Sequence, residues 1–278
     1  MPGLQYFGSR NENTWKIIET ERYIFHIESS VDMDEGLERM IKGADERYLQ
    51  ICDVLEIDCA TTKSKERLRK YNIWIHSHKI AGGNHVTPKE AFMYECTPHS
   101  QWASGVANAS GVNFVKWNIP WHALEGKLLH EETHAIWSHE VGEAPSLLNE
   151  GVAVYVENLL HPAPDALLPQ ERSRFWHEQM GADDWLLRKL TDNEYFFNDP
   201  SKVPAFYNIS GLLVGFIIKK WGVALLKDIF LASYYEDENI AELIEGKTKL
   251  SMEALQCAVG EDLASTDPSH HTAAAPSL

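Results

Sequence analysis

The sequence contains no long hydrophobic run. No segment reaches the roughly eighteen consecutive apolar residues that a membrane-spanning helix needs, so we expect no such helix. The first ten residues do not place a basic stretch before an apolar one, which is the pattern of a secretory signal peptide. These two absences lead us to expect a cytoplasmic protein.

The sequence is also poor in basic residues. Lys and Arg together number 25 against 41 Asp and Glu, which gives a formal net charge of −16. Nucleic acids and anionic membrane surfaces bind basic patches. We therefore expect no nucleic acid and no membrane among the partners, and we interpret the acidic excess as an aid to solubility.

Cysteine is scarce, and its spacing carries no motif. None of the four cysteines, Cys52, Cys59, Cys96 and Cys257, forms a C-x-x-C pair. We interpret them as reduced thiols, the usual state in the cytoplasm, and keep a pair of disulfides as the alternative for an exported protein. A chain of 278 residues is long enough for one large domain or two lobes.

An H-E-x-x-H sequence, His130-Glu131-x-x-His134, carries the main chemical signal. Residues four apart on a helix lie on one face, so both imidazoles can bind the same metal ion. Glu131 lies beside them, where its carboxylate can reach a metal-bound water without binding the metal itself. The alternative is an amphipathic core helix whose histidines are merely hydrogen-bonded.

A metal site of this kind needs a third ligand from the protein. Zinc in catalytic sites is held by three protein ligands and keeps a fourth position open. Glu150, in the sequence Asn149-Glu150-Gly151, follows His134 after fifteen intervening residues, a distance that suits a helix, a turn and a second helix. The sequence therefore predicts a zinc site formed by His130, His134 and Glu150.

The first third of the chain predicts strands and one long helix. Residues rich in β-formers occur within 15–28 and again within 68–78, and apolar residues recur every three or four positions from 33 to 56. His76 and His78 share one face of the second strand segment. We favour a solvent-facing strand edge over metal binding as the explanation for these two histidines.

The remainder is expected to be irregular at first and then helical. Residues 79–110 show no regular period and are interpreted as a long irregular region, followed by a strand at 112–117. The lobes are a mixed α/β lobe at 1–118 and a helical lobe at 119–262, and residues 263–278 are expected to be a disordered tail. The predicted helices span residues 121–138, 146–160, 169–180, 204–221 and 222–234, with shorter pieces to about 258.

The H-E-x-x-H helix and the Asn-Glu-Gly sequence around Glu150 resemble the gluzincin metallopeptidases, most of all the alanyl-aminopeptidase-like branch. The resemblance covers residues 15–235. It implies a zincin-like catalytic domain of the α+β class, with a mixed α/β N-terminal lobe, a mostly helical C-terminal lobe and the active site at the seam. It also implies one zinc ion per chain, a peptide or protein substrate, and an edge strand at 112–117 along the cleft.

A second match to this family lies at Tyr207-x-x-x-Gly211. In the aminopeptidase-like enzymes a tyrosine at the start of such a helix donates a hydrogen bond to the oxyanion of the reaction. The resemblance therefore implies this role for Tyr207. The alternative is an aromatic side chain that is simply buried at the N-terminus of a helix.

Two features differ from the family pattern. The interval between His134 and Glu150 is shorter than in the aminopeptidases, so the connecting turn must be abbreviated. Residues 105–113 contain no acidic residue, whereas the family holds the free amine of its substrate with a Gly-x-Met-Glu-Asn segment. The sequence thus leaves endopeptidase and exopeptidase activity open, and we expect N-terminally blocked peptides to be accepted.

The expected function is that of a zinc-dependent peptidase in which Glu131 is the general base and Tyr207 stabilises the oxyanion. The alternative is a gluzincin-like binding or regulatory module with weak or no turnover. Glu157, seven residues beyond Glu150, is expected either to steady a ligand histidine or to form a surface salt bridge. Glu132 and Glu140 are interpreted as solvated helix residues.

Overall fold

The chain forms two compact units, which we call the sheet unit and the helical unit. The sheet unit comprises Met1–Glu140 with Leu159–Ala163, and the helical unit comprises Val141–Asn158 with Pro164–Leu278. All the described strands belong to the sheet unit, and both units contain helices, so the chain is of the mixed α+β class. The computed structural model describes residues 15–29, 31–58, 70–76, 105–108, 111–115, 121–161, 167–236 and 239–266.

A five-stranded sheet in the order β1-β2-β3-β5-β4 organises the sheet unit. β2, β3 and β5 run parallel to one another, whereas the two outer strands are antiparallel to their neighbours. The first three strands lie where the alternating β-formers predicted them. The bounds are Trp15–Glu19 for β1, Tyr23–Glu28 for β2, Tyr71–His76 for β3, Gly105–Asn108 for β4 and Gly111–Val115 for β5.

Among the described strands, β1 and β4 form the two edges of the sheet, and the prediction that the strand at 112–117 is the edge strand is wrong. β5 pairs with β3 on one side and with β4 on the other, so it lies inside the sheet. β4 occupies part of the segment predicted to be irregular. Its sequence, GVAN, contains glycine and asparagine, which are poor strand formers, so the residue pattern gave no strand signal. Residues 79–104 and 116–120 lie outside the described residues.

The helix expected from 33 to 56 is in fact two helices, α1 (Glu35–Lys42) and α2 (Ala44–Val54). They are separated at Gly43, and glycine is a weak helix former. Arg47 of α2 donates from Nη1 to a carbonyl near the end of α1, at 2.6 Å, which secures the break. Because the apolar period continues across the break, the sequence pattern predicted a single helix.

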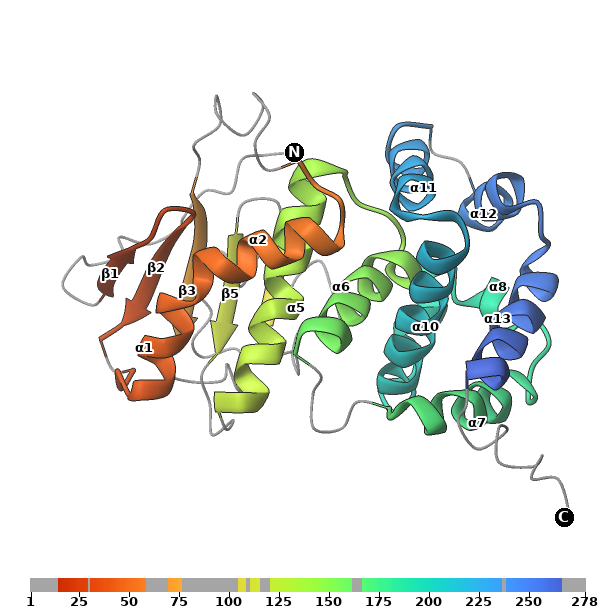
Figure 1. Cartoon of the computed structure of the whole chain (residues 1–278), viewed down its shortest axis with the longest axis horizontal. Coiled ribbons are helices and arrows are strands. Elements are labelled where there is room, and N and C mark those ends of the chain that lie inside the picture. The colour runs from red at the N-terminus through yellow and green to blue at the C-terminus, as the bar shows by residue number, and fades with distance from the viewer. Residues whose placement is uncertain are drawn as a thin grey trace, which may run out of the picture. The chain divides into compact units, whose positions relative to one another are not determined.

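One face of the sheet is covered by helices. Tyr23, Phe25 and Ile27 of β2 are each at most 1% exposed, and the Tyr23 ring lies 6.3 Å from the Tyr48 ring of α2. α5 (Trp121–Glu140) contacts β4, β5, α1 and α2 (Figure 1). These contacts place α5 in the sheet unit, although its helical sequence pattern predicted a place in the helical lobe. The apolar period of a helix does not show which elements the helix packs against.

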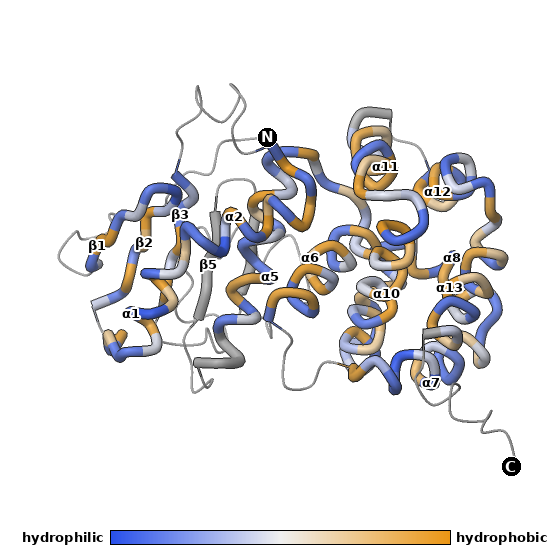
Figure 2. Tube along the Cα trace, in the orientation of Figure 1, coloured by the Kyte–Doolittle hydropathy of each residue, from blue (hydrophilic) through white to orange (hydrophobic). Residues whose placement is uncertain are grey.

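The remaining described elements are helices, and the four whose positions were predicted, α6, α7, α10 and α11, begin and end within two residues of those positions. α10 contacts α9, α11 and α13, while α7 and α8 pack against α13. Figure 2 shows α6 and α10 as largely hydrophobic stretches, as expected for helices buried on several sides. The bounds are Ser146–Leu160 for α6, Pro169–Met180 for α7, Leu186–Lys189 for α8, Asn193–Phe197 for α9, Val203–Trp221 for α10, Val223–Glu236 for α11, Ile240–Thr248 for α12 and Met252–Thr266 for α13.

α10 ends at Gly222, whose φ of +84° is a conformation that favours glycine, and α11 begins at the next residue. No single described helix has both the length and the apolarity needed to cross a membrane. α10 and α11 reach that level only as a pair, and the chain bends by 119° between them.

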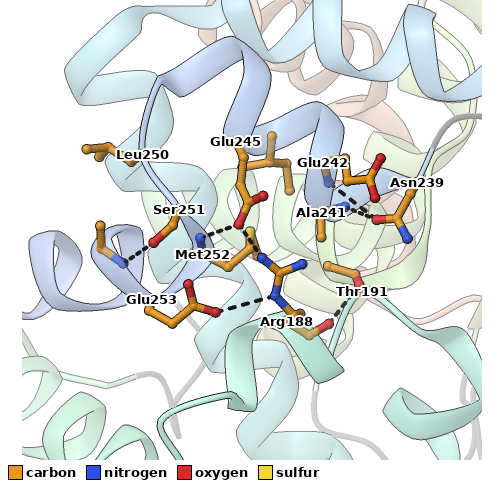
Figure 3. A network of polar contacts seen from close by, with 12 residues as sticks. Arg188, Thr191, Asn239, Ala241, Glu242, Glu245, Leu250, Ser251, Met252 and Glu253 are labelled. Atoms are coloured by element: carbon orange, nitrogen blue, oxygen red, sulfur yellow. Dashed lines mark hydrogen bonds and ion pairs between the residues drawn. The ribbon is translucent and has the colours of Figure 1, made fainter.

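A charged cluster centred on Arg188 ties three helix ends of the helical unit together (Figure 3). Its Nη2 pairs with Glu245 of α12, and its Nε donates to Glu253 of α13 at 3.4 Å. Glu245 also accepts from the backbone amide of Met252 at 2.8 Å. The three charged side chains remain between 25% and 36% exposed, so water screens the cluster.

Two expectations are corrected by the fold. α13 continues to Thr266, so the first residues assigned to a disordered tail at 263–278 are helical, and residues beyond 266 lie outside the described part. Cys52 is buried and disulfide-bonded, so the prediction that all four cysteines are reduced is wrong, whereas Cys257 is a free and exposed thiol. Sequence spacing does not show which cysteines meet in space, so the cysteine argument for the cytoplasm no longer holds.

Candidate metal centre

Helix α5 carries the H-E-x-x-H sequence in a stretch that is firmly packed. Leu128, Leu129, Ala135 and Ile136, which flank the motif on both sides, are each at most 1% exposed. Close packing on both sides anchors this stretch of the helix in the interior of the sheet unit. His130 itself is buried, with 8% of its surface exposed, so its ring has little freedom.

The two histidines of the motif converge on one point. Their Nε2 atoms are 3.2 Å apart, and the ring planes meet at 77° with centroids 4.8 Å apart. Two imidazole nitrogens on one tetrahedral zinc ion, with bonds of about 2.0–2.1 Å, are separated by about 3.3 Å. The spacing therefore suits a shared metal ion, although a single shared proton between the rings gives a similar distance.

Glu150 completes the group predicted from the sequence. One ligand atom from each of His130, His134 and Glu150 lies within 4.8 Å of the others, and the group could hold a metal ion. Among the described residues, it is the group of three or more His, Cys, Asp or Glu side chains that could hold a metal ion. Two neutral nitrogen donors and one carboxylate form a chemically reasonable donor set for a divalent transition metal.

His139 is also on α5, but it is not part of this group. His139 is one residue from the end of α5, with its Nδ1 2.8 Å from Glu140 Oε1, and its ring packs edge-on against Tyr71. The side chains of His76 and His78 lie outside the described residues. Glu140 is exposed, as the sequence suggested.

Glycines bring α6 and α10 into close contact. A Cβ on Gly151 would lie 2.6 Å from Val214 Cγ2 and 2.7 Å from the Ser210 carbonyl oxygen, and one on Gly211 would lie 2.5 Å from Val154 Cγ1. Real side-chain carbons do not approach this closely, so the two helices can touch here only because both positions lack a side chain.

This contact explains why the two motifs of the helical unit contain glycine. Gly151 directly follows Glu150, and Gly211 lies about one helical turn after Tyr207. The contact between α6 and α10 therefore fixes the starting points of the Glu150 and Tyr207 side chains relative to each other. Tyr207 is half-buried near the start of α10, and its ring lies 6.0 Å from that of Phe196.

Glu132 is fully buried, and its interpretation as a solvated residue is wrong. Arg47 of α2 holds it with two parallel hydrogen bonds, from Nε to Oε2 at 2.9 Å and from Nη2 to Oε1 at 3.0 Å. The side chains are 8% and 0% exposed, respectively. A paired carboxylate in the interior thus stands one residue from Glu131 and two from each histidine of the motif.

The surroundings of this pair are buried. Burial raises the pKa of the Glu132 carboxyl, and the Arg47 guanidinium offsets part of that rise. Burial also raises the pKa of Tyr23 well above its usual value, and the nearby Glu132 carboxylate adds to the rise. Tyr23, on β2, is itself only 1% exposed, so this region of the sheet unit lies in the interior.

A signal for this pair is present in the sequence. Arg47 falls within the apolar stripe of its helix, between Ala44 and the pair Tyr48 and Ile51, all of which are buried. A charged residue in a buried stripe requires a partner of opposite charge. The position of Arg47 in the apolar stripe therefore predicts a buried acidic partner, but it does not identify that partner as Glu132.

The chain was compared with known proteins. No protein-family model matches it, and neither a curated protein nor a solved structure does. The functional argument therefore rests on the side chains of the site and their geometry.

Proposed function

We propose that the chain is a zinc-dependent peptidase that hydrolyses peptide bonds with an activated water. The observation that carries this proposal is the grouping of ligand atoms from His130, His134 and Glu150 within 4.8 Å of one another. Two histidines and one glutamate form the protein ligand set of many catalytic zinc sites. Ferrous iron accepts a similar set, but the carboxylate of Glu131 beside a ligand histidine favours zinc-assisted hydrolysis.

In the proposed chemistry, the metal ligands and the general base have separate roles. A zinc ion bound there would polarise a carbonyl oxygen and lower the pKa of water to about 7. The carboxylate of Glu131 takes a proton from the attacking water and passes it to the leaving amine. Glu131 is about 100° around α5 from His130, so its carboxylate stands beside the ligands rather than among them.

Two further residues have proposed roles, Tyr207 because of the family resemblance and Glu157 because of its spacing from Glu150. The hydroxyl of Tyr207 would donate a hydrogen bond to the oxyanion that forms as the water attacks. The fixed contact between α6 and α10 supports this role, since an oxyanion donor must be positioned before the reaction. Glu157, half-buried on the same helix as Glu150, would steady a ligand histidine.

The edge strand β4 offers a binding surface for an extended peptide. β4 is antiparallel to β5 and contacts α5, the helix of the H-E-x-x-H sequence. A peptide can extend a sheet at such an edge through backbone hydrogen bonds, which do not depend on a free amino terminus. Neither β4 (GVAN) nor β5 (GVNFV) contains an acidic residue that could bind a terminal amine, which favours internal cleavage.

The second candidate is a binding or regulatory module with this fold and little or no turnover. Such a module needs the ligands for stability, but it has no need for a general base. The presence of Glu131 in the expected position therefore favours the enzyme.

Replacing Glu131 by glutamine tests the proposal. The amide has the shape of the acid but cannot take a proton from water, so turnover should fall by about 10²–10⁴-fold while zinc content is kept. The matched control is Glu143→Gln, the same change at an exposed position, which should leave activity unaltered. The assay is cleavage of a mixed peptide library containing free and N-terminally blocked members. The proposal of peptidase activity would be contradicted by a Glu131→Gln protein that is still active, or by a wild type that cleaves no peptide.

A further inference from the structure

The Arg47–Glu132 pair lies on the opposite side of α5 from the two histidines. At about 100° per residue, Glu132 is about 180° around the helix from the midpoint between His130 and His134. One side of α5 thus presents the ligand atoms, while the other is held by a charged residue of α2. Arg47 also donates to the Met40 carbonyl at 2.6 Å, so it connects the end of α1, α2 and α5.

The type of interaction restrains rotation of α5 more tightly than apolar packing does. Arg47 makes two parallel hydrogen bonds to the carboxylate, and this geometry allows only one orientation of the two planar groups. Apolar contacts tolerate small rotations, since they have no preferred direction. With Glu132 0% exposed, water cannot replace a bond that breaks when the helix turns.

The required precision makes such a restraint useful. A ligand nitrogen lies about 6 Å from the helix axis, so a rotation of 10° displaces it by about 1 Å. Metal–ligand distances tolerate only about 0.2 Å. Both histidines are on α5, so one rotation would displace both ligand atoms together.

Stability alone does not account for a charged pair in this position. Replacing a buried ion pair by apolar side chains of similar volume is often neutral or stabilising, because removing two charges from water costs about as much as their attraction returns. The best-attested benefit of such a pair is to fix one arrangement among similar ones.

We propose that Arg47 and Glu132 are positioning residues that set the rotation of α5 and so hold His130 and His134 at the spacing a metal ion requires. The inference rests on the proposed function, because it concerns the same site. It assigns to the pair no contact with metal or substrate, only control of the helix that carries two ligands.

The test separates positioning from folding by replacing both charged side chains with apolar ones in the same variant. Arg47→Met combined with Glu132→Leu removes the pair without leaving an unpaired buried charge, so the variant should unfold at or above the wild-type temperature. Its zinc dissociation constant, measured by competition with a chromogenic chelator, should rise by about 10–100-fold. The visible spectrum of the cobalt-substituted protein should also change, since it reports ligand geometry.

If the double variant does not fold, a single conservative substitution tests the positioning role independently. Arg47→Lys keeps the positive charge but cannot make the two parallel bonds, so zinc affinity should fall and the cobalt spectrum should change. Arg188→Lys, the same exchange in the helical unit, should alter neither. Zinc affinity and cobalt spectrum equal to wild type in a folded double variant or in Arg47→Lys would overturn the inference while leaving the peptidase proposal intact. A wild-type protein that binds no zinc would overturn both.

Discussion

The sheet unit and the helical unit fix their helices by opposite means. In the sheet unit, α5 is held by an ion pair whose side chains are 8% and 0% exposed. In the helical unit, α6 and α10 approach through glycines, and the charged cluster around Arg188 stays 25% to 36% exposed. The same kinds of charged side chain therefore contribute differently to stability in the two units. Burial determines how much the free energy of unfolding falls when one partner is removed.

The largest expected effect on stability comes from removing one buried charge. Arg47→Met leaves Glu132 without its partner in the interior and should lower the free energy of unfolding by about 3–5 kcal/mol. The matched change in the helical unit, Arg188→Met, should cost about 1 kcal/mol or less, because water solvates what remains. Urea unfolding followed by circular dichroism measures both, and equal losses would contradict the comparison.

A large effect on activity is expected from the helical unit. Tyr207→Phe removes only a hydroxyl and should lower kcat by about 10²–10³-fold, with KM and zinc content nearly unchanged. This result would show that the Tyr207 hydroxyl takes part in the chemistry. Steady-state kinetics and metal analysis provide the measurement, and an unimpaired variant would remove the oxyanion role.

The close contact between α6 and α10 predicts an intermediate effect. Gly211→Ala places a methyl group 2.5 Å from Val154 Cγ1, so the Val154 side chain or the helices must shift, at a cost of about 1–3 kcal/mol. Gly246 of α12 is the control, since a Cβ there meets nothing within 4 Å. Gly246→Ala should be neutral or stabilise by up to about 1 kcal/mol. A harmless Gly211→Ala would mean that the contact is looser than described.

The smallest effect concerns acid stability in the sheet unit. Asp45 of α2 accepts hydrogen bonds from Thr20 Oγ1 and from the amides of Glu21 and Arg22. Burial alone raises the pKa of Asp45, but these bonds outweigh burial and hold the pKa below its ordinary value of 3.8. A carboxyl whose pKa is lowered by folding stabilises the fold above the unfolded pKa, and that stability is lost as pH falls through the folded pKa.

Asp45→Asn should therefore destabilise the fold by about 1 kcal/mol at pH 7 and progressively less below about pH 4. Asp53→Asn, an exposed change on the same helix, should show no such dependence. Thermal melts across this pH range distinguish the two. A difference between wild type and Asp45→Asn that stays constant down to pH 2 would contradict the assignment.

Sequence patterns predicted features that depend on local periodicity. The helices after Trp121 follow from apolar residues that recur every three or four positions, the histidine pair from a spacing of four, and Glu150 from the fifteen residues between it and His134. The structure groups His130, His134 and Glu150 so that they could hold a metal ion. The zinc itself and the peptidase activity stay predictions.

Features that depend on distant partners could not be predicted in this way. The strand β4 is defined by pairing with β5 rather than by its own residues, and the burial of Glu132 is decided by Arg47, 85 positions earlier in the chain. The disulfide at Cys52 likewise depends on a meeting in space. The break at Gly43 is local, but the continuous apolar stripe concealed it.

The metal content of purified protein tests the central claim most directly. Wild type purified without added metal should contain one zinc ion per chain by elemental analysis, since two histidines and one glutamate are the protein ligand set of many catalytic zinc sites. His130→Ala, His134→Ala and Glu150→Ala should each lose the zinc, whereas His139→Ala, which changes a histidine of α5 that lies outside the group, should keep it. A folded Glu150→Ala protein that retains full zinc, or a wild type without zinc, would contradict the account.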